Sequence, residues 1–154
     1  MQRTTQLYAG DLAVGFAFRG EPKLLSLEHF SQFSALTGDK HPIHYDPAFA
    51  AKTKFGRPVA HGLLLTAMTA FGATPFSEAI EDAMVALVEQ QMRFLRPAFI
   101  GDVVTPEFKV ASNKPSAGGR MAVVELSVWL SNQAGERILE GRHVYVLRRG
   151  PDSK

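Results

Sequence analysis

The sequence predicts an α+β domain in which a mainly antiparallel sheet of about five strands lies against one buried helix. Three patterns support this class. Residues 121–130 alternate apolar and polar side chains, as a half-buried strand does. Residues 62–71 are apolar throughout and carry no charge, which is typical of a helix buried on every side. Helix signals are concentrated in the first half of the chain, and strand signals fill the second half.

The first half begins with a short apolar segment, residues 11–19, which suits a strand. Ser26 is a suitable N-cap for the helix that follows, and Gly38 is expected to end it. Residues 39–60 form a long irregular stretch with three prolines, apart from a short helix expected at 47–52. A loop of that length inside a compact domain is uncommon and usually functional.

The second half reads as four strands, at residues 86–95, 103–111, 121–130 and 138–148. Pro106 is expected at an edge or a bulge, because proline cannot donate a backbone hydrogen bond. Residues 132–135 should turn the last two strands into a hairpin. We assign residues 1–150 to one domain and residues 151–154 to a disordered tail. A sheet that curls around one apolar helix covers only one side of it, so a homodimer is expected.

Composition limits the functional classes. The chain has 154 residues and no cysteine, which fits one domain and excludes disulfides and thiolate metal sites. The net charge of +2 is too small to indicate a nucleic-acid partner. No apolar run reaches the ~20 residues that a membrane span requires, and the first residues lack a signal-peptide pattern. We therefore expect a soluble, cytoplasmic protein with no membrane partner.

Asp39 and His44 are the candidate catalytic residues. They lie in one tight irregular turn that contains Pro42, so their side chains are able to converge. A carboxylate and an imidazole together form a general acid–base pair that is able to hold one water molecule. Gly62 stands where the apolar helix begins, and its free N–H would be a donor to a developing oxyanion.

This region carries a family resemblance. The pieces that match are Thr37-Gly38-Asp39, Pro42-Ile43-His44, Asp46, Phe55-Gly56 and Ala60-His61-Gly62. Together they resemble the hydratase motif of MaoC-like proteins, which include (R)-specific enoyl-CoA hydratases and hydroxyacyl thioester dehydratases. The resemblance implies the hot-dog fold, a curved antiparallel sheet wrapped around a long central helix. It also implies a homodimer whose sheets join edge to edge.

The resemblance also implies the activity and the roles of the matched residues. Asp39 and His44 match the family's catalytic pair, and Gly62 matches the glycine whose N–H polarises the thioester carbonyl. The implied reaction is (R)-specific hydration of a trans-2-enoyl-CoA, or the reverse dehydration of an (R)-3-hydroxyacyl thioester. No cofactor is expected, because the CoA or acyl-carrier thioester is itself the substrate.

Two more histidines are grouped with Gly62 as candidates for binding the substrate. His41 occupies a position where the family usually has asparagine, so the network that holds the water should differ. His61 precedes Gly62, and its alternative role is to pack beside the start of the helix. His41, His44 and Asp46 have a spacing that would also allow metal ligation, but we expect no metal here.

Two other functions share these patterns. A hot-dog thioesterase usually has a carboxylate on or near its central helix, and residues 62–71 contain none. A non-catalytic acyl-binding subunit would be expected to lack Asp39 or His44, and this chain has both. Arg93 and Arg96 are either solvated residues at a sheet edge or contacts for the phosphates of the thiol carrier.

Overall fold

The computed structural model describes residues 5–151, so all of the expected tail except Pro151 lies outside the described residues. The helices are α1 (Leu27–Thr37), α2 (Pro47–Ala50), α3 (Gly62–Ala67) and α4 (Phe76–Ala79). The strands are β1 (Ala17–Arg19), β2 (Lys23–Leu24), β3 (Met84–Phe94), β4 (Val103–Pro115), β5 (Met121–Ser131) and β6 (Arg137–Arg148). No helix among the described residues is long and apolar enough to cross a membrane.

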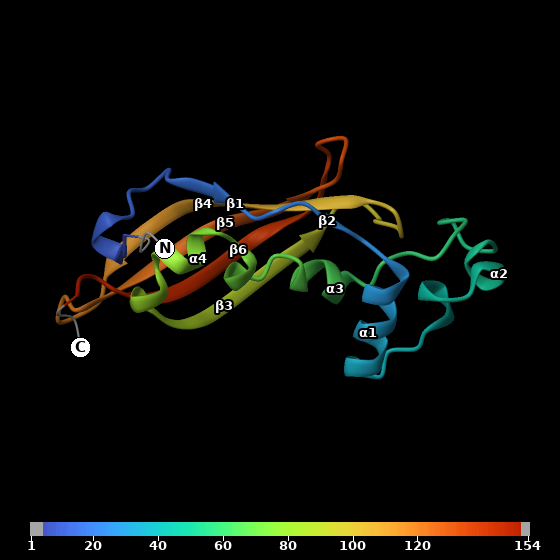
Figure 1. The fold of residues 1–154 in the computed structure, drawn as a ribbon, viewed down its shortest axis with the longest axis horizontal. Helices are drawn as coiled ribbons and strands as arrows, with labels where there is room; N and C mark the ends of the chain where they lie inside the picture. The colour runs from blue at the N-terminus through green and yellow to red at the C-terminus, as the bar shows by residue number, and fades with distance from the viewer. Residues whose placement is uncertain (1–4, 152–154) are drawn as a thin grey trace.

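The strands form one antiparallel sheet in the order β1-β4-β5-β6-β3, and β2 also pairs with β4. Helices α3 and α4 lie along one face of this sheet, whereas α1 and α2 lie beyond one end of the strands (Figure 1). The predicted α+β class is confirmed. Strand β3 forms an edge of the sheet, and no strand of the described chain pairs with its outer side.

The long strands bury one face, as their alternation predicts. In β5 the apolar residues at positions 122, 124, 126, 128 and 130 are all buried, and the residues between them are less so. Pro106 lies in β4 between the residues that pair with β2 and those that pair with β1. Its missing N–H therefore falls where β4 lacks a continuous neighbour on that side, which explains how proline is tolerated in a strand.

The amino-terminal strand is shorter than the sequence suggests. Residues 9–11 form a 3₁₀ turn, and β1 begins only at Ala17. The turn is stabilised by Asp11, whose carboxylate accepts a hydrogen bond from the Tyr8 N–H at 2.9 Å. A short polar side chain that bonds to nearby backbone in this way competes with strand pairing.

Helix α1 has the predicted ends. The Ser26 hydroxyl accepts the N–H of His29 at 3.3 Å, and Gly38 takes the left-handed conformation that ends the helix. Helix α3 differs from its prediction, since it ends at Ala67 and a 3₁₀ turn follows at residues 71–73. Leu64 and Leu65 are buried, but Leu63 is 69% exposed. The prediction that this helix is buried on every side is therefore wrong within a single chain.

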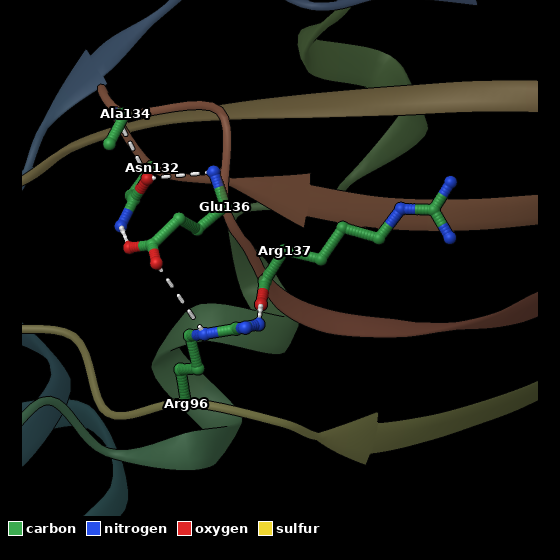
Figure 2. A network of polar contacts seen from close by, with 5 residues as sticks. All are labelled: Arg96, Asn132, Ala134, Glu136 and Arg137. Carbon is green, nitrogen blue, oxygen red and sulfur yellow. Dashed lines mark hydrogen bonds and ion pairs between the residues drawn. The ribbon is translucent and has the colours of Figure 1, made fainter.

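The hairpin between β5 and β6 closes through a polar turn (Figure 2). Asn132 Oδ1 accepts the N–H groups of Ala134 and Glu136, both at 3.0 Å. The Glu136 carboxylate also accepts from the Asn132 amide and lies 3.8 Å from Arg96 Nε. Arg96 in turn donates to the Arg137 carbonyl at 2.9 Å, so this turn holds the segment that follows β3.

Candidate active site

The loop after α1 brings Asp39 and His44 together. Asp39 Oδ1 accepts the N–H of His41 at 3.1 Å, which bends the chain immediately after Gly38. Residues 42–44 then form a 3₁₀ turn, capped by His41 Nδ1, which accepts the N–H of Ile43 at 3.3 Å. One ligand atom each from Asp39, His44 and His61 lies within 4.8 Å of the others. The predicted pair thus shares one small space with a third side chain.

The tautomer of His44 follows from one hydrogen bond. His44 Nδ1 lies 2.6 Å from the carbonyl oxygen of Val59. A carbonyl oxygen can only accept, so Nδ1 carries the proton. In the neutral ring, Nε2 therefore has a free lone pair and is able to act as a base. The same bond fixes the plane of the ring.

His61 lies against His44 and is buried. The two rings stack with centroids 3.8 Å apart, and His61 is 3% exposed. His61 Nε2 is 2.6 Å from the hydroxyl of Tyr45, which also lies within hydrogen-bond reach of the carbonyls of Phe30 and Asp39. Burial lowers the pKa of His61, and the nearby His44 adds to that effect. His61 therefore stays neutral and supports the His44 ring from behind.

Asp39 is ionised in this environment. The His41 N–H that it accepts is the main cause that holds its pKa below the usual value, and the nearby imidazoles of His61 and His44 act in the same direction. Its side chain is exposed to solvent. Two acceptors, the Asp39 carboxylate and His44 Nε2, are therefore available to the two O–H groups of one water molecule.

Gly62 presents a free backbone donor beside the pair. Its N–H has no acceptor among the residues that the structure describes. A Cβ at this position would lie 2.9 Å from the Phe94 ring, so a larger residue here would have to displace that ring or the start of α3. His44, Gly62 and Phe94 line a cavity of about 420 Å³, together with Leu65 and Arg96.

Among the predicted site residues, Asp39, His41, Asp46 and His61 lie outside the lining of that cavity. His41 is exposed and caps the 3₁₀ turn, and His61 lies behind His44. Asp46 caps α2 by accepting the N–H groups of Ala48 and Phe49 at 2.8 and 3.1 Å. Arg96 does line the cavity, but its guanidinium is engaged by the hairpin turn (Figure 2).

Among the described residues, the group that offers ligand atoms for a metal is Asp39, His44 and His61 rather than the spaced set with His41 and Asp46. His61 Nε2 is committed to Tyr45, which leaves His61 Nδ1, a buried atom without a hydrogen-bond partner in the described chain. The Tyr45 hydroxyl and the Val59 carbonyl hold the two histidines by contacts that the sequence did not indicate, since the bonded positions are 15 or 16 residues apart.

Comparison with known proteins gives the family. The model of the MaoC like domain matches residues 15–131. An (R)-specific enoyl-CoA hydratase of Aeromonas caviae is 37% identical over 103 residues, which cover 59% of this chain and 75% of that protein. A 3-hydroxybutyryl-CoA dehydratase of Methylorubrum extorquens is 32% identical over 109 residues, or 71% of this chain and 67% of that protein.

A solved structure supports the fold. A Mycobacterium tuberculosis protein with a double hot-dog fold superposes with a TM-score of 0.78 at 22% identity, over 97% of this chain and 46% of that one. The predicted hot-dog architecture is thus confirmed. The hydratase and dehydratase relatives confirm the prediction of an enzyme of the hydro-lyase type. With three quarters of its length matched by the family model, the chain belongs to the MaoC-like domain family.

Proposed function

We propose that this enzyme hydrates trans-2-enoyl-CoA to (R)-3-hydroxyacyl-CoA, or catalyses the reverse dehydration, through Asp39 and His44. The observation that carries this proposal is the His44 Nδ1 bond to the Val59 carbonyl, because it leaves Nε2 with a free lone pair on a ring that shares one small space with an ionised carboxylate. The (R) configuration is taken from the name of the Aeromonas caviae relative.

In the proposed mechanism one water molecule donates to both acceptors. His44 Nε2 removes a proton while the water oxygen bonds to the β-carbon and the double-bond electrons move towards the thioester carbonyl. The imidazolium then returns the same proton to the α-carbon of the enolate. Because the oxygen and the proton arrive from one side, the addition is syn. Asp39 holds the second O–H and stabilises the imidazolium by its negative charge.

The Gly62 N–H is placed to meet the charge on the thioester oxygen. That oxygen gains negative charge as the enolate forms, so a donor aimed at it stabilises the transition state more than the substrate. Gly62 and His44 line the same cavity, which allows one substrate to meet both. Removing one donor of this kind typically costs about 10²–10³ in rate.

The functional assembly in this proposal is a homodimer joined through β3. That strand is an exposed edge whose apolar side chains Val85, Leu87, Val88 and Phe94 are each about half exposed. An open edge of this length with exposed apolar side chains invites pairing with another strand. The double hot-dog chain of the Mycobacterium tuberculosis protein supports pairing of two such domains.

One assay tests the function. Crotonyl-CoA is mixed with the protein, and both the absorbance of the enoyl group and the appearance of free thiol are followed. Hydration removes the absorbance without releasing thiol, and chiral analysis of the product should give the (R) alcohol. Thiol release would instead indicate the thioesterase alternative. If neither signal appears with enoyl-CoA thioesters of several chain lengths, the proposed hydration is wrong.

A further inference from the structure

A second cavity lies along the edge strand β3 and is not used by the proposed reaction. Its volume is about 1070 Å³, and Leu63, Ala67, Val85 and Leu87 contribute apolar walls. We refer to it as the β3 groove. Its lining shares no described residue with the catalytic cavity, because α3 turns Gly62 and Leu65 to one space and Leu63 and Ala67 to the other.

A chain of hydrogen bonds ends in the wall of the β3 groove. Gln90 Nε2 lies 2.8 Å from Nε2 of His143, which is 1% exposed. Burial lowers the pKa of His143 to about 4, so this ring is neutral and has one N–H and one lone pair. Since the Gln90 amide donates to Nε2, the proton lies on Nδ1, which then donates to the Tyr145 hydroxyl oxygen at 3.3 Å.

Thr69 does not interrupt this chain. Its hydroxyl oxygen is 3.4 Å from His143 Nε2, but it donates its own proton to the carbonyl of Thr66 at 2.6 Å. The short contact with Gln90 is therefore the one that decides the tautomer of His143.

Tyr145 is left with an unused donor. Its hydroxyl accepts from His143, and its own proton has no acceptor among the described residues. The side chain lines the groove, is 6% exposed, and its pKa is raised by burial to about 12. A buried donor without an acceptor is costly, and each bond in such a chain strengthens the next. The Tyr145 hydroxyl is thus prepared to donate to a ligand oxygen.

The charges around the groove restrict that ligand. Glu78 and Glu81 belong to its lining, whereas its described lining includes no lysine or arginine. A ligand carboxylate or phosphate would be repelled there. An apolar ligand that carries a neutral hydrogen-bond acceptor is not repelled, and its acceptor pairs with the Tyr145 hydroxyl.

We propose that the β3 groove binds the distal part of the acyl group, and that Tyr145 donates a hydrogen bond to a neutral oxygen on it. The substrate class is then an acyl thioester whose chain carries a ketone, hydroxyl or ether beyond the β-carbon, rather than an unsubstituted alkyl chain. This inference rests on the proposed function for the identity of the ligand as an acyl thioester.

The groove is in reach of a catalytic cavity through the proposed homodimer. Phe94, at the end of β3, lies against Gly62, whereas the groove is lined by the start of the same strand at residues 84–87. When two copies of β3 pair antiparallel, the end of one strand faces the start of the other. An acyl chain held at Gly62 of one copy therefore extends towards the groove of the second copy.

The test uses saturated thioesters, so that binding is measured without the reaction. Octanoyl-CoA and its isomers that carry one ketone beyond the β-carbon are titrated calorimetrically into the full-length wild-type protein, Tyr145→Phe and Tyr8→Phe. Tyr8→Phe is the matched control, because it removes a hydroxyl outside the groove. At least one isomer should bind the wild type about 5- to 100-fold more tightly than octanoyl-CoA. Tyr145→Phe should lose that preference, and Tyr8→Phe should keep it.

Two results would overturn the inference: no isomer preferred by the wild type, or a preference that survives Tyr145→Phe. If Tyr145→Phe does not fold, the titration is repeated with Gln90→Met. This substitution removes the hydrogen bond from Gln90 to His143, and it lies at an exposed position on β3. It should reduce the preference severalfold, and an unchanged preference would count against the inference. A failure to hydrate crotonyl-CoA would contradict the proposed reaction. The calorimetric titrations would still test whether the β3 groove binds an oxygen-bearing acyl chain.

Discussion

At the scale of single residues, the hydrogen bonds already made decide what each side chain in the site has left to offer. His44 donates its Nδ1–H to the Val59 carbonyl and keeps a lone pair on Nε2. The His41 N–H donates to Asp39 and favours its carboxylate form. His61 is neutral, buried and stacked on His44. The two groups that face water are thus both acceptors, which is the arrangement that a bound nucleophilic water requires.

Removing either acceptor should abolish most of the hydration activity while the fold is retained. We expect Asp39→Asn and His44→Ala each to lower kcat by about 10²–10⁴-fold, the usual contribution of a general acid–base group. The initial rate with crotonyl-CoA measures the effect, and circular dichroism checks the fold. Asp82→Asn changes an exposed aspartate outside the site and should leave the rate unchanged. A variant at 39 or 44 with nearly full activity would remove that residue from the mechanism.

Gly62 allows a steric prediction that is separate from its role as a donor. Gly62→Ala keeps the N–H, but its Cβ would meet the Phe94 ring at 2.9 Å and displace the amide. A misplacement of this size typically costs about 10- to 100-fold in kcat/KM. The double variant Gly62→Ala/Phe94→Leu should recover much of the loss, because the smaller side chain gives way. If the double variant is no better than the single one, Phe94 is not the cause.

At the scale of elements, sequence patterns worked where the structure is local. Helix α1 has its predicted cap and end because Ser26 and Gly38 act on backbone within a few residues. The β5–β6 hairpin follows from alternation and a polar turn. Helix α3 is shorter than predicted and is not fully buried, since Leu63 and Ala67 line a groove while Leu64 and Leu65 pack into the core. A run of apolar residues predicts that a surface is apolar, but it does not show which part of the protein, or which second molecule, covers that surface.

The same reasoning applies to the site. The motif indicated Asp39 and His44, which have ligand atoms within 4.8 Å of each other, and Gly62, which lines one cavity with His44. It did not indicate the Tyr45 hydroxyl, which ties His61 to the end of α1. Nor did it give a role to His143. Its partners Gln90 and Thr69 are distant in sequence, and only the pairing of β6 with β3 brings Gln90 to it.

His143 makes the junction of β6, β3 and the end of the α3 segment sensitive to pH. Its pKa is about 4 in the folded protein, against 6.5 for an exposed histidine, so the unfolded chain binds more protons between these values. Stability is therefore complete above about pH 6.5 and should fall by about 2–3 kcal/mol on acidification to about pH 4.5.

Urea unfolding of the wild type and His143→Gln at these two pH values measures this contribution. Glutamine has no titrating group, so the variant should lose less stability on acidification, and the difference between the two losses should match the value above. Equal losses in both proteins would assign the acid sensitivity to other groups.

At the scale of the whole molecule, the sheet of the described single chain has an unpaired edge, and two cavities lie beside it. The sheet has a long open edge at β3 with exposed apolar side chains towards its two ends, and both the catalytic cavity and the β3 groove adjoin that strand. Pairing two copies through β3 would cover the exposed side chains and place the two cavities across the junction. In such a pair each chain would supply the chemistry, and the partner would help to exclude bulk water from it.

A charge at the middle of β3 tests this assembly. Val88 is 55% exposed and lies next to the centre of the strand, so in an antiparallel pair it approaches the same residue of the other copy. Val88→Lys would place two ammonium groups together at the joined edge, and lysine is a residue that prevents edge pairing. Sedimentation at micromolar concentration should then give a species of 16.9 kDa, whereas the wild type should have twice that mass.

Val14→Lys changes a valine that is 66% exposed outside the sheet, and it should sediment as the wild type does. A wild-type protein that sediments as a single chain, or a Val88→Lys variant that stays paired, would show that the two copies do not meet through β3.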